Sequence, residues 1–149
     1  MKNQSLRFLS LLLSLCLVLC LWAFTVSCKK EISEDYGSFG RVDLDLSVIS
    51  GTVVYAAVNQ MVNAPDDYIG KIIKVNGEYT TAYSSATNLT YPSVLVADAT
   101  ACCQQGIEFV LKKNGRYPEK GANVTVIGRF ETYTENGLPY FHLVEAELL

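Results

Sequence analysis

Apolar residues recur with the period of β-strands in the second half of the chain. Residues 71–83, 106–111 and 122–134 alternate between apolar and polar side chains, and residues 91–99 form a short run that is apolar on both faces. Residues 138–149 form a fifth run, and the Glu-Asn-Gly segment before it is a hairpin-turn signal. The chain is therefore predicted to be mainly β, with five strands.

A helical period precedes these runs. Five apolar residues fall at helical spacing, and Pro65 ends the pattern. They are Val53, Val54, Ala57, Val58 and Met61. We predict a helix over residues 52–63. Its β-branched residues make it a weak helix former, so packing against the strands must hold it.

Two of the predicted strands share a glycine at a matched place. Gly77 follows Val75 in one strand, and Gly128 follows Val126 in the other. Glycine inside a strong strand costs stability and usually marks a bend, a bulge or a close backbone approach. Two strands bent at matched places favour a small closed barrel, because a flat open sandwich would not need both glycines.

The N-terminal residues have the pattern of an export signal. Lys2 and Arg7 precede an uncharged apolar run over residues 8–26, and small or β-branched residues lead to Cys28. This end of the run resembles the lipobox of bacterial lipoproteins, although Thr25 stands where that family usually has leucine. The resemblance implies a signal peptide over residues 1–27 and acylation of Cys28. The run of 19 residues also fits an uncleaved helical anchor, and ordinary secretion is a third alternative.

Removal of residues 1–27 changes the charge of the chain. Ten basic residues then face 15 acidic ones, so the net charge is near −5. The remaining 122 residues suffice for one domain with a hydrophobic core. Residues 28–49 are rich in charged, Gly and Ser residues and predict a flexible tether, with a loosely docked N-terminal strand as the alternative. We place the folded domain at residues 50–149.

Two segments resemble a known family. "PDDYIGKIIKVNGEY" at residues 65–79 and "YPEKGANVTVIGRFETY" at residues 117–133 are similar to OB-fold proteins related to the tRNA-anticodon-binding-like domain. The likeness extends to small bacterial lipoproteins with a Cys-Cys loop after the second strand. It implies a five-stranded OB-like β-barrel over residues 50–149, here preceded by one α-helix and by the N-terminal signal or anchor helix. Gly77 and Gly128 would be its bend residues.

Nucleic acid is an unlikely partner for this chain on charge grounds. Non-specific readers of single strands use a basic groove with exposed aromatic rings. Here the basic residues are offset by neighbouring acidic ones, and an acidic exported chain repels phosphate backbones. Five tyrosines could stack on bases or sugars, but strand tyrosines at a barrel rim are more often structural. They are Tyr79, Tyr83, Tyr91, Tyr133 and Tyr140.

Cys102 and Cys103 are the candidate chemical site. Adjacent Cα atoms lie about 3.80 Å apart across a trans peptide, whereas disulfides usually need about 4.4–6.8 Å, so a vicinal disulfide would be strained and reducible. The two thiolates could instead bind Zn²⁺ or Cu⁺, with Asp98 or His142 as further ligands. A third interpretation is that both cysteines are small buried packing residues. A buried, hydrogen-bonded His142 is the simpler interpretation of that residue.

No motif for catalysis is present in the sequence. It contains one histidine and no HExxH, nucleophile-elbow or phosphate-loop pattern. We therefore predict a non-enzymatic binding or adaptor module in the bacterial cell envelope, extracytoplasmic and tethered to the lipid membrane through acylated Cys28. Its expected partner is an envelope protein or a small ligand, with no cofactor. The alternatives are a zinc- or copper-handling protein and a thiol redox protein, both using the Cys102/Cys103 loop.

Overall fold

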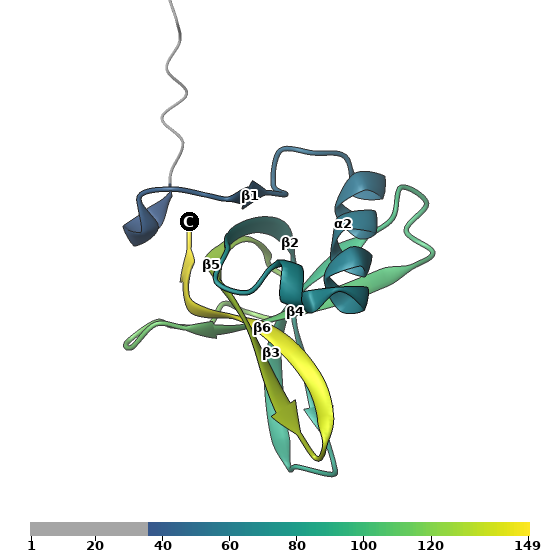
Figure 1. Cartoon of the computed structure of the whole chain (residues 1–149), viewed down its shortest axis with the longest axis vertical. Helices are drawn as coiled ribbons and strands as arrows, with labels where there is room; N and C mark the ends of the chain where they lie inside the picture. The colour runs from purple at the N-terminus through teal and green to yellow at the C-terminus, as the bar shows by residue number, and fades with distance from the viewer. Residues whose placement is uncertain (1–35) are drawn as a thin grey trace, which may run out of the picture. The chain divides into compact units, whose positions relative to one another are not determined.

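Five long strands form where the strand pattern predicts them (Figure 1). Their bounds are β2 Ile72–Ser84, β3 Leu89–Ala97, β4 Gln104–Leu111, β5 Asn123–Glu135 and β6 Leu138–Leu148. The β5–β6 turn is the predicted one: Asn136 and Gly137 have φ of 51° and 80°, as a two-residue hairpin turn of the primed type requires. The mainly-β prediction is confirmed.

The computed structural model describes residues 36–149. The predicted signal peptide or anchor helix over residues 1–27, the acylation site Cys28 and residues 29–35 of the predicted tether lie outside the described residues. Within residues 36–149, no helix has both the length and the apolar character needed to cross a membrane.

Hydrogen bonding between the strands closes into a ring. β2 pairs antiparallel with β3, β3 with β4, and β5 with both β6 and β2, while β4 and β6 pair in parallel. The ring closes because β2 serves two partners: residues 72–78 pair with β5, and residues 78–84 pair with β3. The two largest fully buried side chains, Phe109 and Phe130, belong to one core cluster between the strands of this ring, and Leu46 and Met61 join the cluster from outside the ring.

Gly77 lies where β2 changes partner. A Cβ at this position would overlap the carbonyl oxygen of Leu95 on β3 and would lie 2.8 Å from Val94 Cγ2. Gly128 lies on β5 at a register shift against β6, and a Cβ there would lie 2.9 Å from Leu143 Cβ. Both glycines therefore allow two backbones to approach more closely than any other residue would permit.

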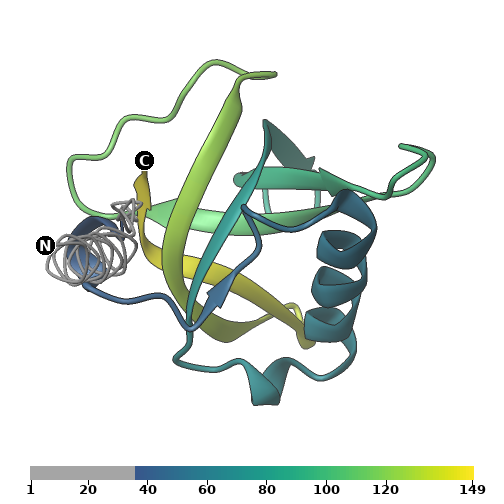
Figure 2. The same cartoon turned by 90° about the horizontal axis from the view of Figure 1, so that it is seen from above.

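The helix α2 covers one side of the ring (Figure 2). It spans Gly51–Asn63, which confirms the helix predicted from residue 52, and it packs on β3 and β4. Val54, Val58 and Met61 are buried, whereas half of the Val53 surface is exposed. One face of the helix is therefore buried against the sheet and the other is exposed. The packing of the buried face stabilises the helix, since its β-branched residues have low helix propensity.

Part of the predicted tether is docked instead. Strand β1, Leu44–Asp45, pairs in parallel with β2, and Leu46 is only 1% exposed in the core. A 3-10 helix, η1 at Gly37–Phe39, precedes it, and Ser38 donates from its amide and its hydroxyl to the Glu147 carboxylate on β6. The expectation of a flexible tether is corrected here, because two leucines around Asp45 provide an apolar face for docking.

We expect Gly77→Ala to lower the free energy of unfolding by about 3 kcal/mol, because the added methyl group overlaps backbone that cannot rotate away. The matched control is Gly106→Ala on β4, where a Cβ would make only ordinary contacts at 3.6 Å. That variant should change stability by less than about 0.5 kcal/mol. Urea unfolding followed by circular dichroism measures both, and equal stabilities would contradict the role of Gly77.

Glu147 should make the stability of the domain depend on pH. Hydrogen bonds from Lys112 and Ser38 lower the pKa of this carboxyl below its ordinary value. Because the pKa of Glu147 is lower in the folded chain than in the unfolded chain, the ionised carboxylate stabilises the fold at pH values above the unfolded-state pKa. This stabilisation is lost as the pH falls through the folded-state pKa. We expect Glu147→Gln to cost about 1 kcal/mol at neutral pH, and the difference in stability from wild type to shrink as the pH falls below about 5. Urea unfolding of both proteins at several pH values measures this difference in stability. A difference that stays constant with pH would contradict the prediction.

Candidate functional site

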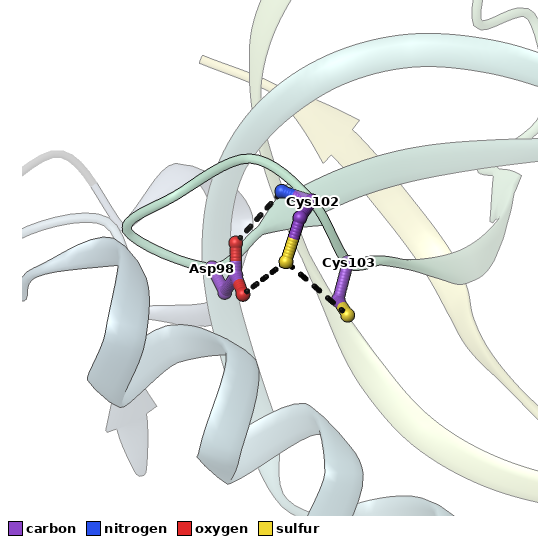
Figure 3. A group of neighbouring side chains, drawn as sticks. All are labelled: Asp98, Cys102 and Cys103. Carbon is purple, nitrogen blue, oxygen red and sulfur yellow. Dashed lines mark hydrogen bonds between the residues drawn. The ribbon is translucent and has the colours of Figure 1, made fainter.

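The loop between β3 and β4 brings three candidate ligands together. Asp98 follows the last residue of β3, and its backbone amide donates to the Cys103 carbonyl over 3.0 Å. Ala101 adopts φ of 54°, and its amide donates to the Asp98 carbonyl over 3.0 Å. This tight turn folds the side chain of Asp98 back toward Cys102, as Figure 3 shows.

The carboxylate and the two sulfurs form one cluster. Asp98 Oδ1 accepts from the amides of Thr100 and Cys102, each over 3.1 Å. Asp98 Oδ2 lies 3.4 Å from Cys102 Sγ, and the two sulfurs lie 3.7 Å apart (Figure 3). All three candidate ligand atoms lie within 4.8 Å of one another. Both thiols are free and exposed, so the interpretation of Cys102 and Cys103 as buried packing residues is wrong.

Local hydrogen bonds set the protonation of this cluster. Desolvation opposes the charge of Asp98, but hydrogen bonds from Cys102 and Thr100 outweigh it and lower the pKa of the carboxyl. The pKa of the Cys103 thiol is raised, first by its hydrogen bond with the Cys102 thiol, then by desolvation and by the Asp98 charge. At neutral pH the Asp98 carboxyl is therefore ionised and the Cys103 thiol is protonated. Reactive cysteines usually have a lowered pKa, so the raised pKa of Cys103 is not typical of a reactive thiol.

His142 does not join this cluster. It lies on β6, opposite Glu108 of the parallel neighbour β4. Its Nδ1 is 3.7 Å from Glu108 Oε1, and its ring centroid is 4.6 Å from that of Tyr133. The structure therefore reduces the proposed ligand set to Asp98, Cys102 and Cys103.

A groove lies where the β2–β3 and β5–β6 hairpins run beside each other. Its volume is about 510 Å³, which is within the range of small-ligand pockets. The lining side chains that can make specific contacts with a ligand are mostly aromatic rings and two carboxylates. These residues are Tyr91, Glu108, Tyr133, Glu135, Tyr140 and Phe141.

Tyrosine hydroxyls hold both carboxylates in place. Tyr91 donates to both oxygens of Glu135 over 2.7 and 2.8 Å, which links the two hairpins. Tyr133 donates to Glu108 over 2.6 Å, and desolvation followed by this hydrogen bond raises the Tyr133 pKa. Tyr133 therefore stays a donor at any physiological pH. Its ring stacks on Tyr140 with centroids 5.6 Å apart, which fixes one wall of the groove.

Sequence reasoning noted these tyrosines but missed the carboxylates. Glu108 and Glu135 lie on polar strand faces, where a carboxylate is ordinarily solvated. They come to one groove because β4 pairs with β6 in parallel and β6 pairs with β5. Only the order of strands in the ring could have revealed this, and alternation within a single strand carries no such signal.

Comparisons with known proteins found little. No protein-family model matches the chain, and no curated protein matches it. One solved structure is similar, a lipoprotein from Klebsiella pneumoniae subsp. pneumoniae that is provisionally called nucleic acid-binding. The two chains are 18% identical, the match covers 70% of this chain and 90% of that one, and the TM-score is 0.45. A likeness this weak supports no argument about the ligand of this chain.

Proposed function

We propose that the chain is a bacterial envelope lipoprotein, anchored through acylated Cys28, whose OB-like barrel is a non-enzymatic binding module. The strand ring supports the barrel assignment, because a five-stranded Greek-key barrel is the OB architecture. In that architecture the ligand face is formed by the second and third strands and by the loops after the first and fourth. Counted from β2, these are β3, β4 and the tips of the two long hairpins.

The observation that carries the proposal is the groove at that same place. Tyr91 and Ser93 of β3 and Gly106 and Glu108 of β4 line it, and Glu135 closes it at the tip of β5. A concave site with aromatic walls and a few fixed polar groups is the usual form of a ligand site. The groove thus combines position, size and chemistry suited to binding.

The chemistry of the groove favours a cationic ligand. Among the described residues that line it, two are carboxylates and none is lysine, arginine or histidine. Tyrosine faces attract cations, and carboxylates form charge-assisted hydrogen bonds with ammonium or guanidinium groups. We infer that the groove takes a lysine or arginine side chain from a basic segment of an envelope protein. Two carboxylates would repel a phosphate backbone, so the groove argues against nucleic acid as the ligand.

The alternative functions use the β3–β4 loop instead. Thiol redox exchange is the less favoured of the two, because Cys103 has a raised rather than a lowered pKa. Metal handling is favoured by one specific observation, the convergence of Asp98, Cys102 and Cys103 within 4.8 Å.

We expect a labelled peptide rich in lysine to bind the full-length chain, and Glu135→Gln to weaken that binding about tenfold because one charge-assisted contact is lost. Fluorescence anisotropy measures both, and added salt should weaken binding further. Glu119→Gln serves as the matched control, since Glu119 is exposed and does not line the groove. Equal binding of a glutamate-rich peptide, or stronger binding of a single-stranded oligonucleotide, would contradict the proposal.

The anchor has its own test in Cys28→Ser. In a bacterial host the wild-type chain should partition with the membrane and carry the added mass of acyl chains, because acylation provides the hydrophobic attachment. Cys28→Ser should leave an unacylated chain, whereas Cys20→Ser should remain acylated. Cell fractionation and intact-mass measurement distinguish the cases. An unacylated wild-type chain found in the membrane would instead support the uncleaved helical anchor.

A further inference from the structure

We propose that Asp98, Cys102 and Cys103 bind one Zn²⁺ ion in a three-ligand site with an open fourth position. The site lies in the β3–β4 loop, does not overlap the groove and is independent of the proposed binding of a cationic ligand.

The separation of the two sulfurs fits a tetrahedral zinc thiolate site. Zinc–sulfur bonds are about 2.3 Å long, so two sulfurs at the corners of a tetrahedron lie about 3.8 Å apart. Cys102 Sγ and Cys103 Sγ are 3.7 Å apart. The same separation is far greater than the roughly 2.05 Å of a disulfide bond, so the loop is arranged for two separate thiols rather than for one bridge.

The carboxylate fits a third corner. With a zinc–oxygen bond of about 2.1 Å, the sulfur–oxygen edge of the tetrahedron is about 3.6 Å. Asp98 Oδ2 lies 3.4 Å from Cys102 Sγ. The third edge, between Asp98 and Cys103, is no more than 4.8 Å, so binding requires only a small closing of the loop.

The orientation of Asp98 is fixed mainly by backbone amides that bind its other oxygen. Oδ1 accepts from the amides of Thr100 and Cys102, and the Thr100 hydroxyl lies 3.0 Å from Oδ1 and 3.1 Å from Oδ2. Oδ2 is thereby turned toward the sulfurs (Figure 3). Hydrogen-bonded partners that orient a ligand in this way are a regular part of metal sites.

The donor set selects the ion. Two thiolates and one carboxylate suit Zn²⁺, which accepts both sulfur and oxygen, whereas Cu⁺ prefers soft sulfur ligands alone. Each thiol releases its proton to solvent on binding, and the three anionic ligands then leave the zinc complex with a net charge of −1. Both thiols are exposed, so water or a ligand atom from another molecule can reach the fourth position.

The test is titration of the purified full-length chain with Zn²⁺ against a chromophoric chelator, and with Co²⁺ as a spectroscopic probe. We expect one ion per chain, and for Co²⁺ the thiolate charge-transfer band together with the intense visible bands of a tetrahedral site. Cys102→Ser and Cys103→Ser should each weaken Zn²⁺ binding more than about 100-fold, and Asp98→Asn by about tenfold. Circular dichroism confirms that each variant folds.

The matched control is His142→Gln, because His142 lies against Glu108 rather than at the loop. It should bind Zn²⁺ as the wild type does. The proposal is overturned if the Cys102→Ser/Cys103→Ser double variant retains the wild-type affinity, or if the Co²⁺ spectrum has no thiolate band. Tight binding of Cu⁺ that Asp98→Asn leaves unchanged, without Zn²⁺ binding, would overturn the choice of ion. Peptide binding in the groove should be unaffected by all loop variants, so the two proposals fail separately.

Discussion

The close approach of two backbones at Gly77 is the constraint on which the ring of strands depends. Only a residue without a side chain lets β2 pass from β5 to β3 at this point, because the Leu95 carbonyl occupies the space of a Cβ. The pairing of one strand with two neighbours leaves none of the five long strands as a free edge. The core around Phe109 and Phe130 and the juxtaposition of the two long hairpins both follow from that closure.

The sequence predicted the features that are determined by residues close together along the chain, and it missed those that depend on residues far apart in the sequence. The strands, the helix and the Asn-Gly turn are local patterns, and all were recovered. The sequence could place Asp98 beside the cysteines because it lies four residues from Cys102, within one loop. It could not place His142, because the position of that residue is set by the parallel pairing of β4 with β6. The docking of Leu46 was only an alternative, since one leucine on each side of Asp45 is too short a pattern to outweigh its charged surroundings.

The groove and the cluster of Asp98, Cys102 and Cys103 lie at different places along the β3–β4 hairpin. Tyr91 of the groove lies near the start of β3, about 23 Å from Asp98 along an extended strand, whereas Gly106 lines the groove from β4, three residues beyond Cys103. No residue of the cluster lines the groove. One hairpin therefore contributes both to an acidic groove with aromatic walls and to a separate cluster of one carboxylate and two thiols.

The docked N-terminal segment limits how far an anchored domain can move from its membrane. Glu147 on β6 holds Ser38, which stands ten residues after Cys28 in the sequence. Fully extended, that length reaches about 35 Å, roughly the thickness of one bilayer. An anchor at Cys28, as proposed above, would keep Ser38 within about that distance of the membrane surface. It could meet proteins that project from the same membrane surface, and it could not reach across a wide compartment to a partner on the far side.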